Sequence, residues 1–438
     1  MPTTPLRHAN AMLPARWLVL LGGVVLALAG CASPDEAHTL TFWTIGREGE
    51  AVAKLLPAFE REHPDIHVNV QQIPLPAAHQ KLLTAFAGDS TPDVSQLGNT
   101  WIAEFATLRA LEPLQARVDR STVVKRDDYF TNIWATNVID DTLVGVPWYV
   151  DTRLIFYRVD LLKAAGFSAP PRNWAQWRKA LAALSRPQQG IYGILLPTNE
   201  YEQLMSLALQ QDEPMVRDGG RYGNFRSEGF KRALSFYVDT FRLHQAPPIT
   251  AVEAGNPWDE FGRGVYAFYF SGPWNIGEFR QRLPAGEQDR WATAPLPGPE
   301  GAGVGAAGGS SLVIFRRSRH KEAAWALIEY LSRPDVQQRF YDLLGDMPAR
   351  RSAWDGDSLR NDPKVLAFRE QLEQVKPTPP VPEWERIANE MQLVAAQAVA
   401  GTLSIDEAAK EMDRRADHIL EKRRWILDHE RRVAGAAP

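Results

Sequence analysis

The sequence is poor in cysteine, in excess charge and in long apolar runs, and each scarcity excludes a class of protein. Its 438 residues contain 1 cysteine, so no disulfide within the chain can hold the fold together. The formal net charge of −4 at pH 7 gives no general attraction to nucleic acid and excludes that class of partner. Hydrophobic residues make up 45% and charged residues 23%, an ordinary globular composition that must be stabilised by a buried core.

The apolar run near the N-terminus, "WLVLLGGVVLALAG" (17–30), is too short and too interrupted by glycine for a comfortable membrane span, which takes about 20 apolar residues. Basic residues precede it, as in a secretory signal peptide. The run ends in Leu-Ala-Gly before Cys31, which resembles a bacterial lipobox, the site where cleavage leaves a cysteine to be acylated. We predict a lipoprotein signal peptide over 1–30 and a lipid-anchored tether over 31–37. The alternative is a plain signal peptide with a chance cysteine.

The chain is longer than one core usually serves and shows no short repeat, so two domains are expected. Strand-like alternation over 39–45, an amphipathic helical pattern over 48–63 and a strand pattern over 66–73 predict a β-α-β unit of the kind that builds parallel sheets. Pro57 inside the helical pattern predicts a kink or an early break. Further strand or helix patterns follow at 77–88, 93–97, 101–108, 172–186, 228–244, 263–274, 311–315, 319–333 and 384–428.

Five segments carry a family pattern. They are "LTFWT…AFEREHPDIHVNV" (40–70), "KLLTAFAGDSTPDV" (81–94), "GVPWYVDTRLIFYRVDLLKAAGFSAPPRNWAQW" (145–177), "FGRGVYAFYFSGPW" (261–274) and "GGSSLVIFRRSRHKEAAWALIEYLSRPDVQQRF…MPAR" (308–350). In this order they resemble the extracellular solute-binding proteins of ABC importers, in particular the carbohydrate-binding group that includes maltose- and trehalose-binding proteins.

The resemblance implies an α/β fold of the two-lobe periplasmic-binding-protein kind (type II). Each lobe would be a mostly parallel sheet flanked by helices, and a hinge would join the lobes around a ligand cleft. By that analogy the N-terminal lobe comprises 37–150 and 309–350, and the C-terminal lobe comprises 151–306 and 355–438. Glycines in the 301–309 stretch suit a hinge because they absorb backbone rotation cheaply.

A sugar presents hydroxyl groups and apolar C–H faces, so its site needs aromatic platforms and hydrogen-bonding side chains. The resemblance aligns Glu48 and Asp151 with acidic residues that contact sugar in trehalose- and maltose-binding relatives. It aligns Trp274 with a tryptophan that stacks on a sugar ring. The other candidate ligand-binding residues lie near turns, strand ends or the crossings between lobes: Asn99, Trp101, Trp148, Tyr149, Trp258, Gly309, Ser310, Arg350 and Trp384.

Several of these residues have a structural alternative that stays open at this point. Asp151 could pair with Arg153 instead of a ligand, and Glu48 could be a charge favoured at a helix N-terminus. Asn99 stands where some relatives have a ligand-binding aspartate, and it could be only a helix N-cap. Trp101 could equally belong to the core.

The implied function is that of a lipid-anchored substrate-binding component of an ABC sugar importer. It would bind an α-linked disaccharide of the trehalose or maltose class and deliver it to permease subunits in the inner membrane. We expect a monomer on the periplasmic side of the envelope, anchored to the inner or outer membrane through Cys31, with no catalysis, no metal and no cofactor. "GVGAAG" (303–308) precedes a strand, the reverse of the order in a dinucleotide-binding fingerprint.

Two alternatives remain. A lipid-anchored glycoside hydrolase would need two carboxylates about 5–9.5 Å apart, which Glu48 and Asp151 could supply in a shared cleft. The same fold could instead bind a non-sugar solute, such as a polyamine, ferric ion or a phosphorylated metabolite.

Overall fold

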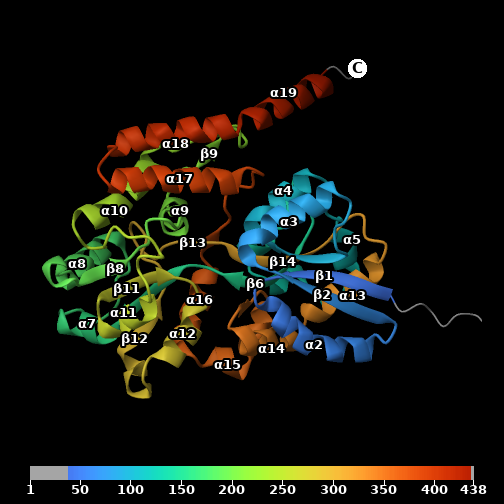
Figure 1. Cartoon of the computed structure of the whole chain (residues 1–438), viewed down its shortest axis with the longest axis horizontal. Helices are drawn as coiled ribbons and strands as arrows, with labels where there is room; N and C mark the ends of the chain where they lie inside the picture. Colours follow the sequence, from blue (N-terminus) through green and yellow to red (C-terminus); the bar gives the residue numbers. More distant parts are fainter. Residues whose placement is uncertain (1–37, 436–438) are drawn as a thin grey trace, which may run out of the picture.

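The computed structural model describes residues 38–435, so the predicted signal peptide, the tether and Cys31 lie outside the described residues. Two β-sheets organise the described chain, and each packs against its own set of helices (Figure 1). The predicted two-lobe α/β arrangement is confirmed.

The first sheet has six strands in the order β15-β6-β14-β3-β1-β2. In Figure 1, α2 and α14 lie on one side of it and α3 and α4 on the other. Its strands are β1 (His38–Ile45), β2 (Ile66–Ile73), β3 (Val94–Gly98), β6 (Val146–Asp151), β14 (Gly308–Ile314) and β15 (Met347–Pro348). The helices of this part are α2 (Glu48–Glu62), α3 (Leu75–Ala87), α4 (Ile102–Thr107), α5 (Gln115–Arg120), α6 (Thr131–Ala135), α13 (Lys321–Leu331) and α14 (Pro334–Leu344).

The second sheet has four strands in the order β12-β7-β11-β8. They are β7 (Leu154–Arg158), β8 (Tyr192–Leu195), β11 (Tyr266–Ser271) and β12 (Trp291–Ala294). Its helices are α7 (Val159–Ala164), α8 (Trp174–Leu184), α9 (Glu202–Leu209), α10 (Glu228–Arg242), α11 (Pro257–Arg263), α12 (Asn275–Arg282), α15 (Asp357–Arg360), α16 (Pro363–Leu372), α17 (Trp384–Val399), α18 (Ile405–Ile419) and α19 (Glu421–Gly435). Short strand pairs complete the fold: β4 (Val138–Ile139) with β5 (Thr142–Leu143), β9 (Val216–Arg217) with β10 (Tyr222–Gly223), and β13 (Gly305–Ala306) with β16 (Val375–Lys376).

The prediction of mostly parallel sheets is wrong in detail, because both sheets are mixed. β1 is parallel to β2 and to β3, as the β-α-β pattern predicts, whereas β14 is antiparallel to both β3 and β6. The reason is the direction of entry. β3 and β6 end beside the point where β14 begins, since Gly98 pairs with Ser310 and Asp151 pairs with Gly308. A strand that returns from the other sheet must therefore run the opposite way.

The chain passes between the sheets at 151–154, because β6 ends at Asp151 in the first sheet and β7 begins at Leu154 in the second. Gly309 lies at the return crossing with φ of +115°, and a Cβ there would lie 2.3 Å from the Tyr149 carbonyl oxygen. Only glycine allows this close approach of two backbones.

Two predictions about helices are settled by the structure. α2 runs unbroken through Pro57, so of the predicted kink or early break the early break is wrong. The residue four positions earlier, Ala53, is exposed, so water can satisfy the carbonyl that the missing proline N–H leaves free. α17 and α18 are separated at Gly401 in a left-handed conformation, as the sequence pattern indicates. None of the described helices is both long and apolar enough to cross a membrane.

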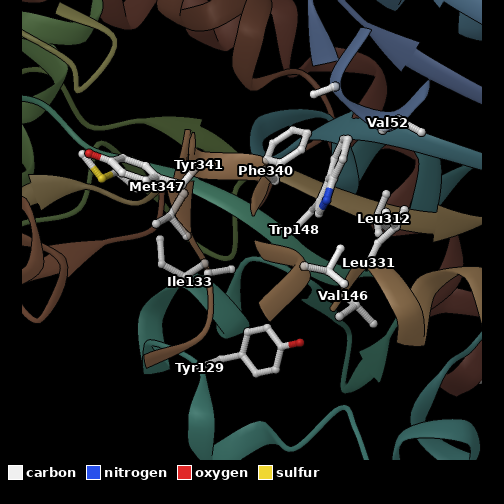
Figure 2. Packing of buried hydrophobic residues seen from close by; sticks show 14 of the residues in the cluster. Val52, Tyr129, Ile133, Val146, Trp148, Leu312, Leu331, Phe340, Tyr341 and Met347 are labelled. Atoms are coloured by element: carbon white, nitrogen blue, oxygen red, sulfur yellow. The ribbon is translucent and has the colours of Figure 1, made fainter. Parts of the chain in front are cut away.

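The core beneath the first sheet is built around aromatic rings. Trp148 packs against Phe340 of α14 with ring centroids 4.6 Å apart and lies among aliphatic side chains such as Val146 and Leu331 (Figure 2). A second cluster, which includes Trp177 of α8, fills the space between the second sheet and α8, α10 and α17. The two sheets are thus backed by packed interiors that hold the strand ends in place.

Candidate functional site

A cleft of about 470 Å³ opens at the carboxyl ends of β1, β3 and β6, the place where ligands bind in open α/β sheets. One wall comes from these strand ends and from the start of β14. The other comes from α9, from the segment before β14 and from the start of α17. The lining residues are Ile45, Gly46, Glu48, Leu75, Gln96, Gly98, Asn99, Thr100, Trp101, Tyr149, Asp151, Arg153, Tyr201, Glu202, Met205, Ala306, Ala307, Gly308, Gly309, Ser310, Thr378 and Glu385.

A hydrogen-bonded network forms the floor on the side of the first sheet. The Tyr149 hydroxyl donates to Glu48 Oε1 at 2.7 Å, and Ser310 Oγ donates to the Tyr149 oxygen at 3.0 Å. Buried Gln96 joins them, because its Nε2 lies 3.2 Å from Glu48 Oε1 and 3.1 Å from the Tyr149 oxygen while its Oε1 accepts from the Ile45 N–H at 2.8 Å. These contacts fix Glu48 before any ligand arrives, which lowers the entropy cost of binding.

Burial and the neighbouring Glu48 and Asp346 carboxylates raise the pKa of Tyr149 well above its ordinary value, so its hydroxyl remains a donor. The pKa of Asp346, in the turn between α14 and β15, is also raised. Burial, together with the charges of Glu48 and Asp151, raises the pKa of Asp346 to about 7. The carboxyl groups of Glu48, Asp151 and Asp346 thus influence one another, and that of Asp346 is about half protonated at neutral pH.

Asn99 lines the cleft and has a buried side-chain donor without a partner in the described part of the chain. Only 9% of the residue is exposed, its Oδ1 accepts from Ser311 Oγ at 3.2 Å, and its Nδ2 has no partner among the described residues. A buried amide without a hydrogen bond costs about 1–3 kcal/mol, so a polar ligand atom at this point is favoured. Asn99 makes no N-cap hydrogen bond, since the 3₁₀ turn Asn99–Trp101 begins with Gly98 at the cap position.

Asp151 and Arg153 form an ion pair at the crossing between the sheets. Arg153 Nη1 lies 3.1 Å from Asp151 Oδ1, Nη2 lies 3.5 Å from Glu202 Oε1, and the guanidinium lies 4.6 Å from the ring centre of Trp274. Burial disfavours the charged guanidinium, but the carboxylates outweigh it and raise the pKa of Arg153. Burial also raises the pKa of Glu202, against the effect of Arg153. Asp151 therefore pairs with Arg153 and also lines the cleft.

Seven of the twelve predicted ligand residues line this cleft, and the sequence placed them at strand ends. They are Glu48, Asn99, Trp101, Tyr149, Asp151, Gly309 and Ser310.

Trp148 and Trp384 do not reach the cleft, and their predicted contacts are corrected. Each is 1% exposed, Trp148 in the core beneath the first sheet (Figure 2) and Trp384 in the second cluster. Arg350 is also turned away: its Nε donates to Asp128 Oδ2 at 2.6 Å and its Nη1 to the Ser332 carbonyl at 2.9 Å. Two of these side chains are packed in the cores, the third is held by its hydrogen bonds, and none of them lines the cleft.

The other two predicted tryptophans lie near α12, outside the cleft. Trp258 donates from Nε1 to Asn275 Oδ1 at 2.7 Å and is covered by the Arg282 guanidinium, 4.6 Å from its ring centre. Trp274 is 41% exposed, but it lines a neighbouring cavity of about 370 Å³, and Arg153 covers one face of its ring.

Sequence reasoning missed several residues that complete the cleft. Gln96 is a polar residue in the middle of a buried strand, which was a usable signal because an amide there needs partners. Glu385 follows Trp384 directly, so the predicted segment was right and the residue was off by one. Tyr201 and Glu202 carry no local signal, and Arg153 was considered only as a partner of Asp151. Among the described residues, no group of three or more His, Cys, Asp or Glu side chains could hold a metal ion.

A family model for bacterial extracellular solute-binding proteins matches residues 43–338, more than half of the chain. The chain belongs to this family. Among solved structures, this solute-binding protein is similar to the sugar-binding protein MalE of Xanthomonas citri, with 55% identity and a TM-score of 0.87 over 89% of this chain and 99% of that one. It is also similar to the GacH receptor of Streptomyces glaucescens, solved unliganded and with acarbose, with 25% identity and a TM-score of 0.75 over 88% of this chain and 99% of that one. A further relative is an arabinooligosaccharide-binding protein of Bacillus subtilis, 23% identical over 80% of this chain and 84% of that one.

Proposed function

We propose that this solute-binding protein is the sugar receptor of an ABC importer and that it binds an α-linked disaccharide of the maltose or trehalose class in the cleft. The observation that carries the proposal is the unpartnered amide of Asn99 beside the preformed network of Glu48 and Tyr149. Such a surface offers a donor and fixed acceptors to adjacent hydroxyl groups, and a ligand without those hydroxyls would leave them unpaired. The 55% identity to a protein described as sugar-binding supports the same conclusion.

The charge of the cleft disfavours an anionic ligand. Among the described lining residues Glu48, Asp151, Glu202 and Glu385 are acidic, and Arg153 is the one cation. Because Arg153 already serves two of these carboxylates, a phosphorylated metabolite would find no free cation and would face uncompensated negative charge. The volume of about 470 Å³ lies within the range of about 300–1,000 Å³ usual for small-molecule sites. Trp101 supplies an aromatic surface at the rim.

We further propose the lobe boundaries implied by the resemblance, 37–150 with 309–350 and 151–306 with 355–438. The change of sheet between Asp151 and Leu154 supports the first boundary. Ligand would stabilise the closed arrangement of the lobes, which the permease subunits then engage. The protein would act as a monomer held at the periplasmic side of the envelope through acylated Cys31, and it would catalyse no reaction.

Isothermal titration calorimetry against a solute panel tests the ligand class. Heat of binding is expected with maltose or trehalose and not with spermidine or glucose 6-phosphate. Absence of heat with maltose, trehalose and sucrose refutes the disaccharide claim. Asn99→Ala removes the unpartnered donor together with the acceptor of the Ser311 hydroxyl, so it is expected to weaken binding about tenfold and to lower the melting temperature slightly.

Two further measurements separate the alternatives. Release of more than one equivalent of monosaccharide from a disaccharide during incubation would favour the glycoside hydrolase. Cys31→Ser is expected to abolish incorporation of labelled palmitate and release the protein from the membrane fraction, whereas unchanged labelling would exclude Cys31 as the lipid acceptor.

A further inference from the structure

One carboxylate joins the two walls of the cleft. Glu385, in the first turn of α17, accepts a hydrogen bond at Oε1 from the Thr100 hydroxyl, and it accepts another at Oε2 from the Tyr201 hydroxyl at 3.0 Å. Thr100 belongs to the 3₁₀ turn that directly follows β3 of the first sheet. Tyr201 is the N-cap residue of α9 on the side of the second sheet. The Thr100–Glu385 bond therefore spans the cleft, while the Tyr201–Glu385 bond lies within one wall.

The second wall holds Glu385 in a fixed position. Its neighbour Trp384 is 1% exposed in the core between α10, α17 and α18, so the start of α17 cannot move independently of that core. A negative charge in the first turn of a helix is also favoured by the helix dipole. Burial and the Glu385 and Glu202 carboxylates raise the pKa of Tyr201, so its hydroxyl stays protonated and donates to Glu385. Thr100 then meets an acceptor whose place is already set.

We propose that Glu385, through Thr100, is a clasp that stabilises the closed arrangement of the two cleft walls and so sets how long a bound solute stays. This deepens the proposed function, on which its ligand readout rests. A bond formed only when the walls meet contributes nothing to the open state, so it shifts the closed–open equilibrium by its full net free energy. Losing it should appear mainly as faster dissociation, because a bound solute leaves through the open state.

Three features make the pair suitable for this role and unsuited to a purely structural one. All three side chains line the cleft and are half-buried, so neither core is disturbed when one of them changes. When the cleft opens and the Thr100–Glu385 bond breaks, the Tyr201 hydroxyl still donates to Glu385, so opening leaves no isolated buried charge. The acceptor is charged, which makes each hydrogen bond stronger than one between neutral groups.

The decisive comparison is between Thr100→Val and Thr100→Ser. Valine keeps the shape of threonine and removes the donor, whereas serine keeps the donor. With Thr100→Val, small-angle X-ray scattering of the ligand-free protein is expected to show a larger radius of gyration than the parent. Stopped-flow dissociation of maltose or trehalose is expected to be about tenfold faster, equivalent to ~1.4 kcal/mol. Thr100→Ser should match the parent in both measurements.

A double-mutant cycle assigns the effect to the pair. Glu385→Ala is expected to speed dissociation in the parent and to have a clearly smaller effect in Thr100→Val, because the shared bond is already gone. Equal effects in both backgrounds would overturn the clasp, as would a Thr100→Val protein with the parent's radius of gyration and dissociation rate. The scattering comparison needs no sugar. If no sugar binds but Thr100→Val still opens the protein, the proposed ligand fails and the clasp stands.

Discussion

Replacement of Asp151 by alanine separates a ligand contact from a structural ion pair. Asp151 lines the cleft and pairs with Arg153 at 3.1 Å, with the two side chains 30% and 15% exposed. Removing one partner of a fully buried pair costs about 3–5 kcal/mol. Here Asp151 is open to the cleft, and Arg153 keeps Glu202 at 3.5 Å and the ring of Trp274 at 4.6 Å. We therefore expect the free energy of unfolding to fall by only ~1 kcal/mol.

The expected loss of affinity is larger. A hydrogen bond from a sugar hydroxyl to a carboxylate contributes about 1.5–3 kcal/mol, which corresponds to a dissociation constant raised roughly 10- to 100-fold. Calorimetric titration with the best ligand of the panel measures this loss. Thermal unfolding of the ligand-free variant measures the cost in stability.

The ion pair of Arg158 and Asp160, a few residues further along the chain, offers a matched control. Arg158 and Asp160 are also two residues apart and pair through Nη2 and Oδ2 at 2.7 Å, but they do not line the cleft. Asp160→Ala should lower stability by a similar amount and leave affinity unchanged. If Asp151→Ala instead behaves like Asp160→Ala, with intact affinity in the folded protein, Asp151 is a structural partner of Arg153 and the ligand assignment is refuted.

Two further predictions address the carboxyl cluster and the core. The pKa of Asp346 is raised from 3.8 to about 7, so the folded protein retains a proton that the unfolded chain has lost, and stability falls as pH rises from about 4 to about 7. Asp346→Asn should therefore stabilise the protein by ~2–4 kcal/mol at pH 8 and by little at pH 4, and equal melting temperatures of variant and parent at pH 8 would contradict the raised pKa. Trp384→Ala should lower the free energy of unfolding by about 3–5 kcal/mol in denaturant titration, because it empties a fully buried site. A loss of affinity without a loss of stability would contradict this core position and support the predicted ligand contact of Trp384.

Much of the fold follows from local pattern. The period of apolar residues placed α2 and β2 within one or two residues of their ends, and the β-α-β pattern gave the parallel pairing of β1 with β2. The direction of β14 was not predictable in this way. It depends on which side of the first sheet the chain returns to after 156 residues between Asp151 and Gly308, and no local pattern records that.

The same division holds for the site. Glu48 and Asp151 could be named from the sequence because the resemblance aligns both with acidic residues of sugar-binding relatives, and for Glu48 because it follows the carboxyl end of a strand. The tryptophans could not be assigned, because a large aromatic ring serves a core and a sugar platform equally well. Trp148 and Trp384 are buried, whereas Trp101 lines the cleft.

The sequence by itself determined the family, the two-lobe plan and the strand ends that carry polar side chains. Periodicity and contiguous motifs, which are local properties of the chain, are enough to predict these three features. Only the tertiary structure decided which side chains meet. Arg153 reaches Glu202, and Glu385 reaches Thr100 across 285 positions of sequence. Contacts between residues so far apart depend on how two sheets and their helices pack, and packing is a property of the whole fold rather than of any segment.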